Sequence, residues 1–112
     1  INGPDETLIC GLTMGADGGI GSTYNVMPGW FAKLFDSFKA GDLATAQEYQ
    51  YKANRVIDAL LRFSKFGAIR GTKAALELKG FDVGDAIFPA RPYDKEELVA
   101  YKKELSGLGI EF

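Results

Sequence analysis

The sequence predicts the closing part of an α/β fold followed by a helical extension. In the first quarter of the 112 residues, short glycine-rich segments alternate with helix-like stretches, and the rest is helical throughout. An α/β domain with only two strands is unlikely to be an independent unit, because a parallel sheet needs both faces and both edges covered. We therefore expect residues 1–40 to hold the last strand–helix units and residues 41–112 the extension, in one structural domain with an upstream part. The chain starts at Ile1 rather than at methionine, and truncation or processing is the simplest interpretation.

Proline and glycine mark the predicted elements of the first part of the chain. Pro4 suits the first position of a helix, which we expect to run to about Met14 and to stop at Gly15. Residues 18–23 are rich in glycine and are interpreted as a turn followed by a strand. Pro28 indicates the start of the next helix. The apolar face of the first predicted helix consists of Leu8, Ile9 and Leu12.

The remainder of the chain has only helical apolar spacing. Asp42 can cap the longest predicted helix, and Asp94 with Glu97 three residues later resembles a capping box at the start of the last helix. Gly41 and Gly80 are expected to end the helices that precede them. The predicted helices cover residues 28–40, 42–64, 69–79 and 94 onward.

The composition excludes several classes of function. Thirteen basic against fifteen acidic residues leave a net charge of −2, so nucleic acid is not expected as a partner. The absence of histidine excludes Ser-His-Asp and Cys-His catalysis within this chain, as well as the commonest zinc ligand sets. Cys10 is the single cysteine, which is typical of the reducing cytoplasm. No apolar run approaches the roughly 20 residues that cross a bilayer, so no membrane is expected.

Two polar segments stand at predicted strand-to-helix junctions, residues 2–6 and 15–23. In α/β sheets, ligands bind outside the carboxyl ends of the strands. The structural alternative stays open, because acidic residues in a first helical turn commonly interact with the helix dipole and Gly-Gly commonly forms a turn. These two segments are nevertheless the candidate site of the sequence.

The side chains of these segments suit a hydroxylated ligand. Asp5 and Glu6 could accept hydrogen bonds from sugar hydroxyls, and Ser22 could donate or accept one. Gly3 and Gly21 would let backbone amides approach a ligand closely. Because the chain has no histidine and only one cysteine, we expect no metal site among its residues.

Two further motifs have a weaker interpretation. The run from Gly19 to Tyr24 has tyrosine where the dinucleotide fingerprint requires its third glycine, and no P-loop sequence is present, so only a phosphate cradle of backbone amides stays open. Lys65, Arg70 and Lys73 could form a small basic patch, but the many acidic neighbours favour a solvated face.

The two polar segments carry a resemblance to a known family. Residues 15–25, Gly-Ala-Asp-Gly-Gly-Ile-Gly-Ser-Thr-Tyr-Asn, closely resemble a stretch of bacterial N-acetylneuraminate lyases, and residues 2–6 resemble the strand-end motif that precedes it. The spacing of the two motifs agrees, and residues 41–42 and 70–73 follow the same pattern. The resemblance implies a (β/α)8 barrel, of which this chain would be the end of strand 7, helix 7, strand 8 and helix 8, followed by the helical C-terminal extension.

The resemblance also implies a reaction. In this family a lysine amine forms an imine with sialic acid, and retro-aldol cleavage releases N-acetylmannosamine and pyruvate without a cofactor. The imine lysine, a proton-transferring tyrosine and the carboxylate-binding loop lie upstream of the matching segment, so no catalytic residue is expected here and the chain alone should be inactive. The positions that match contacts to the hydroxylated sugar tail are Gly3, Asp5, Glu6, Gly21 and Ser22. The expected partners are the sugar acid, pyruvate, the upstream barrel half and further copies of the chain in a homo-oligomer such as a tetramer.

Two alternatives stay open. One is another pyruvate-dependent aldolase of the same superfamily that acts on a different sugar acid. The other is a non-catalytic helical fragment that self-associates through apolar surface left exposed where barrel strands would pack. Substrate choice tests the first alternative, and activity together with an intact partner half tests the second.

Overall fold

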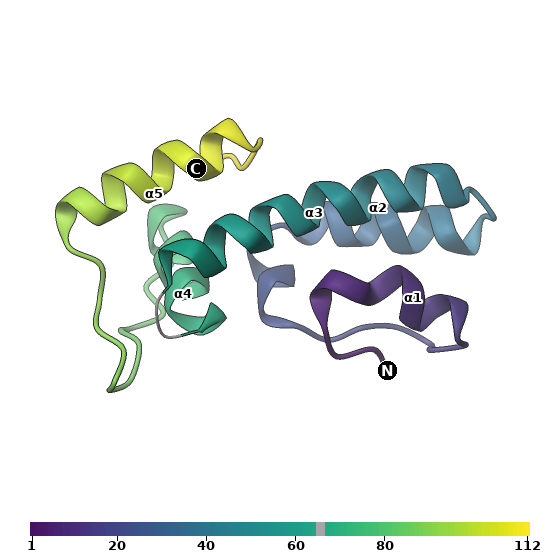
Figure 1. Ribbon diagram of the computed structural model, residues 1–112, viewed down its shortest axis with the longest axis horizontal. Helices are drawn as coiled ribbons and strands as arrows, with labels where there is room; N and C mark the ends of the chain where they lie inside the picture. The colour runs from purple at the N-terminus through teal and green to yellow at the C-terminus, as the bar shows by residue number, and fades with distance from the viewer. Residues whose placement is uncertain (65–66) are drawn as a thin grey trace. The chain divides into compact units, whose positions relative to one another are not determined.

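The computed structural model describes residues 1–64 and 67–112 of the chain. These residues form two compact units, 1–55 and 56–112, each with its own core. The longest helix, α3 (Leu43–Phe63), contributes its first part to one unit and its last part to the other (Figure 1). The sequence-based division at residue 40 stays a prediction.

The first unit combines short helical segments with α2 (Pro28–Lys39) and the first part of α3. The unit begins with the 3₁₀ turn η1 (Asp5–Thr7), which continues into α1 (Leu8–Thr13). A second 3₁₀ turn, η2 (Ser22–Asn25), precedes α2. The helix expected from residue 4 is therefore present, but its first turn is tighter than α-helical, because the Thr7 amide donates to the Pro4 carbonyl at 3.2 Å.

The described residues at the start of the chain form no strand, so the expected strands are not confirmed. The only pairing among the described residues is an isolated parallel bridge between Asn2 and Gly19. The Asn2 amide donates to the Gly18 carbonyl at 2.8 Å, and the Ile20 amide donates to the Asn2 carbonyl at 3.0 Å. Parallel strands are stable when both edges are paired and both faces are covered, and two short segments by themselves do not meet that condition. The bridge nevertheless has the direction that the prediction required.

Apolar contacts form the core of the first unit, and a cation–π contact joins α2 to α3. Leu8 and Leu12 are buried as predicted, whereas Ile9 is half-buried. Lys52 of α3 lies 4.0 Å above the ring of Trp30 in α2, so these two helices lie side by side (Figure 1). The buried apolar residues of this unit are Leu8, Leu12, Val26, Met27, Phe31, Leu34, Ala46 and Ala53.

Three helical segments make up the second unit: the end of α3, α4 (Ala68–Leu78) and α5 (Lys95–Gly107). Gly71 of α4 lies so close to α3 that an added Cβ would be 2.7 Å from Cγ of Leu60. The Tyr101 hydroxyl donates to the Gly71 carbonyl at 3.0 Å and links α5 to the same point. The core residues are Val56, Ile57, Ala59, Leu60, Ala74, Ala75, Tyr93, Tyr101, Leu105 and Ile110. None of the helices described in either unit has the length and hydropathy needed to cross a membrane.

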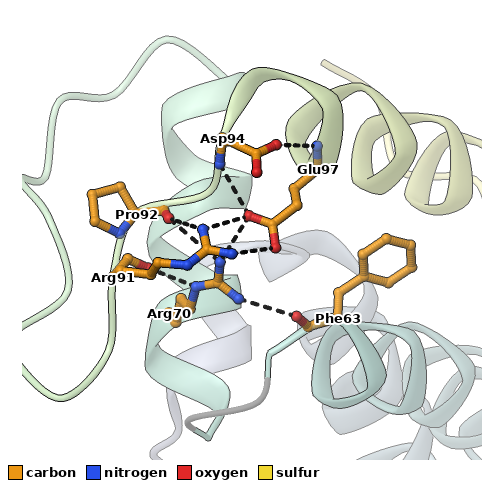
Figure 2. Close-up of polar contacts among 6 residues, drawn as sticks. All are labelled: Phe63, Arg70, Arg91, Pro92, Asp94 and Glu97. Atoms are coloured by element: carbon orange, nitrogen blue, oxygen red, sulfur yellow. Dashed lines mark hydrogen bonds and ion pairs between the residues drawn. The ribbon is translucent and has the colours of Figure 1, made fainter.

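Among the described residues of the second unit, Arg70 has the most deeply buried charge, at 3% exposure, and Figure 2 shows its polar contacts. Its guanidinium donates to the carboxylate of Glu97 at 3.0 Å and to the carbonyls of Arg91 and Phe63, at 2.6 and 3.3 Å. It also lies 3.8 Å from the centre of the Tyr93 ring. The expectation that this arginine belongs to a solvated basic face is wrong, because its side chain is buried and its fork of donors pairs with carbonyls and a carboxylate of the protein. Lys65 of the same expected patch lies outside the described residues.

Glu97 interacts with several groups at the start of α5. The predicted capping box is confirmed: the Glu97 amide donates to Asp94 at 2.8 Å, and the Asp94 amide donates back to Glu97 at 3.0 Å. The same carboxylate accepts two hydrogen bonds from Arg91, at 2.8 and 2.9 Å. These bonds from Arg91 and from the Asp94 amide, with the charge of Arg70 nearby, lower the pKa of Glu97 from 4.5 to about 2.

This lowered pKa predicts a loss of stability in acid. The folded pKa of Glu97 lies below its unfolded value, so its stabilising effect is complete above pH 4.5 and disappears as the pH falls from 4.5 to about 2. We expect the urea midpoint of the second unit to fall across this range, and to fall less in Glu97→Gln. The neighbouring Glu96→Gln serves as the control, because it removes a carboxylate from the same helical turn. Equal acid profiles for the two variants would contradict the assignment.

Candidate functional site

The structure brings the two predicted polar segments together. The bridge between Asn2 and Gly19 aligns their starts, and η1 of the first segment then lies against η2 of the second. All five predicted site residues belong to this region of the first unit. The predicted site is therefore one contiguous region.

Asp5 joins the two segments through its side chain. It is 7% exposed, and its Oδ2 accepts hydrogen bonds from the amide of Thr23 at 2.9 Å and from the Thr23 hydroxyl at 2.5 Å. The amide lies in the first turn of η2, where backbone donors lack partners within the helix. Asp5 therefore positions η2, a structural role that the sequence prediction did not include. Oδ1, the other carboxylate oxygen, accepts no hydrogen bond from the described residues.

The two candidate glycines differ in their surroundings. A Cβ on Gly21 would be only 1.4 Å from Oδ1 of Asp5. The φ of Gly21 is −163°, an extended conformation that any residue can adopt. Gly21 is therefore required by close approach to a carboxylate and not by its backbone conformation. Gly3 has no atom within 4 Å of a Cβ position, so the space beside it is open.

Glu6 and Ser22 are the candidates whose side chains are not used by the fold. Glu6 is exposed and Ser22 is half-buried, and neither side chain hydrogen-bonds to another described residue. Only their backbone carbonyls have polar partners: the Ser22 carbonyl accepts from Asn25 at 3.0 Å, and the Glu6 carbonyl accepts from Asn54 at 3.1 Å. A carboxylate and a hydroxyl are therefore available beside the Asp5–Gly21 contact.

Two amide side chains of α3 support the backbone of this region and were missed at the sequence level. Gln50 is buried and contacts residues 5 and 9, and Asn54 contacts Glu6. The available signal is that Gln50 follows the buried Ala46 at the i,i+4 spacing of a helix, on a face that is otherwise apolar. A glutamine on such a face needs partners for its amide.

Tyr24 places a neutral hydroxyl next to the bridge. Its hydroxyl is buried without a hydrogen-bond partner among the described residues, and it would be 2.3 Å from a Cβ on Gly19. Burial, and to a lesser extent the charge of Asp5, raise the pKa of Tyr24 to about 12. The tyrosine therefore stays protonated at neutral pH, and its ring packs 4.0 Å from that of Phe31.

The region carries hydrogen-bonding groups of the kind that pair with hydroxyls. They are the exposed carboxylate of Glu6, the half-buried hydroxyl of Ser22 and the backbone beside Gly3, on segments joined by the two hydrogen bonds of Asp5. Within residues 1–64 and 67–112, the acidic and sulfur side chains form no group of three that could hold a metal ion.

Comparison with known proteins establishes the family. The model of the dihydrodipicolinate synthetase family matches residues 1–108. The chain belongs to this family. Relatives named N-acetylneuraminate lyase match this chain at 38–50% identity, so the resemblance to these lyases is confirmed.

The relatives are lyases and synthases that are longer than this chain. An N-acetylneuraminate lyase of Rhizobium meliloti is 38% identical over 105 residues, which are 94% of this chain and 34% of that protein. The solved Proteus mirabilis N-acetylneuraminate lyase has a TM-score of 0.85 at 28% identity, over 97% of this chain and 36% of that one. A third relative is a prophage protein of the dihydrodipicolinic acid synthase family from Escherichia coli K12, solved in complex with pyruvate. It has a TM-score of 0.82 at 25% identity, and the match covers 97% of this chain and 36% of that one.

The chain thus spans about a third of the length of the relatives it matches. It shares its fold with a segment of (β/α)8 barrel proteins of the dihydrodipicolinate synthase and N-acetylneuraminate lyase type. The assignment of its segments to particular barrel strands and helices stays a prediction.

Proposed function

We propose that this chain is part of a class I aldolase that cleaves N-acetylneuraminate to N-acetylmannosamine and pyruvate. The observation that carries the proposal is the apposition of residues 2–6 and 19–23, which leaves the side chains of Glu6 and Ser22 free beside Asp5. The same two segments carry the sequence resemblance. The names of the relatives support this substrate over others.

In the proposed enzyme this chain binds the substrate and does not break its bond. Gly3, Asp5, Glu6, Gly21 and Ser22 contact the hydroxylated tail of the sugar acid. Glu6 accepts hydrogen bonds from hydroxyl groups, Ser22 adds a donor or acceptor, and Oδ1 of Asp5 is the acceptor that Thr23 leaves free. The two glycines give the chain of hydroxyls access to the backbone.

The bond cleavage belongs to residues outside this segment. A lysine of the upstream part forms the imine with the keto carbon, and the imine accepts the electrons released when the carbon–carbon bond breaks. This chain then corresponds to the end of strand 7 through helix 8 with the helical extension, and alone it has no lyase activity. The complete enzyme is a cytoplasmic homo-oligomer in this proposal.

A second candidate function is aldol chemistry on another sugar acid. It is supported by the similarity to the prophage protein that was solved in complex with pyruvate. Both candidates share the pyruvate half of the reaction and differ in the length and hydroxyl pattern of the other half. Substrate selectivity therefore separates them.

The test uses the complete protein with Glu6→Gln or Ser22→Ala. Each variant should lower kcat/KM for N-acetylneuraminate by about tenfold, because one lost hydrogen bond to a charged or buried partner costs about 1–2 kcal/mol. Turnover of short 4-hydroxy-2-oxo acids, which lack the polyol tail, should be almost unchanged. Glu48→Gln on the exposed face of α3 is the matched control. Equal losses on long and short substrates would rule out tail contacts at these positions, and an inactive wild type on N-acetylneuraminate would favour the second candidate.

A further inference from the structure

Gln50 uses its whole side-chain amide to hold the start of the chain. It is 4% exposed, its Nε2 donates to the carbonyl of Asp5 at 3.0 Å, and its Oε1 accepts the amide of Ile9 at 3.0 Å. Its second N–H donates to Oδ1 of Asn54 at 2.9 Å. A buried glutamine with all of these groups paired has one allowed position, because any shift leaves a buried donor or acceptor without a partner.

Asn54 continues the same row of amides by one helical turn. Its Oδ1 accepts from Gln50, and its Nδ2 donates to the carbonyl of Glu6 at 3.1 Å. Two side chains four residues apart on α3 therefore hold two consecutive carbonyls, those of Asp5 and Glu6. The bond between the amides links the two tethers into one unit.

The segment that these amides hold cannot fix itself. η1 is only three residues long, and a single 3₁₀ turn has little stability of its own. The carboxylate of Asp5 is held from the other side by Thr23, but Glu6 has no side-chain partner among the described residues. The position of the Glu6 carboxylate therefore depends on its backbone, and the backbone depends on α3.

We propose that Gln50 and Asn54 are positioning residues that determine selectivity for long hydroxylated substrates. They act through the backbone of Asp5 and Glu6 and do not touch the substrate. This inference rests on the proposed function, in which the same two residues bind the sugar tail. A displacement of about 1 Å of a binding group is enough to lower activity markedly, so the tethers matter even though they are remote from the reacting bond.

The experiment compares Gln50→Met with Gln47→Met in the complete protein. Methionine keeps the length of glutamine and removes its hydrogen bonds, and Gln47 is the same residue type on the exposed side of the same helix. For Gln50→Met we expect kcat/KM for N-acetylneuraminate to fall about tenfold or more, mainly through KM, while short 4-hydroxy-2-oxo acids change less than about twofold. Gln47→Met should match the wild type on both substrates. The yield of pyruvate trapped on the enzyme by borohydride should be the same in all three proteins.

A second variant is Asn54→Ala. Asn54 is less buried than Gln50, so this variant can be tested even if Gln50→Met does not fold. Because Asn54 acts through Glu6, its effect should be non-additive with Glu6→Gln: the double variant should lose little more activity on the long substrate than Glu6→Gln alone. Additive losses would show that the amide does not act through Glu6 and would overturn the inference. Equal losses on long and short substrates would also overturn it, because a merely structural role affects both.

Failure of the proposed function has a different signature. A wild type that traps pyruvate but does not cleave N-acetylneuraminate would refute the assigned substrate. The long-to-short comparison is then made with the sugar acid that the wild type does cleave. If Gln50→Met leaves the ratio of kcat/KM between that sugar acid and the short substrates unchanged, the positioning role is overturned whatever the substrate is.

Discussion

Replacing Arg70 by methionine is expected to lower the free energy of unfolding of the second unit by about 3 kcal/mol, because a buried guanidinium that pairs with a carboxylate and with backbone carbonyls is removed. Methionine fills much of the same space but cannot donate. The carbonyls of Phe63 and Arg91 and the carboxylate of Glu97 would all lose a donor (Figure 2). Arg70→Lys should recover only part of this loss, since an ammonium group cannot reproduce the planar fork.

Arg62→Met is the matched control for this experiment. Arg62 also pairs with two carboxylates, those of Asp58 and Glu104, at 3.0 and 3.1 Å, but its side chain is 57% exposed. Exposed ion pairs contribute little to stability, so the urea midpoint should barely move. Amide exchange at Ala75, which is fully buried in α4, reports the opening of the unit directly. Similar midpoints for the Arg70 and Arg62 variants would contradict the role given to the buried guanidinium.

The second large effect is expected from Gly21→Ala. The new methyl carbon would lie 1.4 Å from Oδ1 of Asp5, so either the carboxylate or η2 must move. The carboxylate cannot move without losing its hydrogen bonds to Thr23. We expect a stability loss of about 2 kcal/mol, as for an overpacked site. In the complete protein, activity on the proposed substrate, N-acetylneuraminate, should fall roughly a hundredfold, as expected when binding groups are displaced by about 1 Å.

Gly18→Ala isolates the effect of the methyl group itself. Gly18 lies in the same glycine-rich segment, and its Cβ position has no atom within 4 Å. This variant should keep both the melting temperature and kcat/KM of the wild type, as measured by thermal denaturation and by pyruvate release. If Gly18→Ala and Gly21→Ala behave alike, the contact with Asp5 does not explain the glycine at position 21.

The helices could be predicted because their signals are local. Pro28 is the first residue of α2, Gly41 follows its end with a φ of +81°, and Asp42 accepts the Thr45 amide at 3.1 Å at the start of α3. The box at Asp94 depends on a residue only three positions away. Each of these features is determined by neighbours in the sequence, so spacing and residue type are sufficient to find it.

The interactions that could not be predicted join residues far apart in the sequence. Arg70 meets a carboxylate 27 residues later, and Gln50 meets a carbonyl 45 residues earlier. Nothing in the local pattern distinguishes a buried arginine from one on a basic surface. The five candidate residues of the site stay a prediction. The hydrogen bond by which Asp5 supports Thr23 joins residues 18 positions apart, so local spacing could not predict it either.

The contact between Asp5 and Gly21 also restricts the order in which this site can change over evolutionary time. A side chain at position 21 is incompatible with a carboxylate at position 5, whereas a smaller residue at position 5 would vacate the space that the side chain needs. A lineage that acquires a new specificity through position 21 therefore loses least stability and activity when position 5 changes first. The reverse path passes through an intermediate in which both the loop and its support are displaced. Libraries that vary the two positions together would reach substrates that single-site libraries cannot.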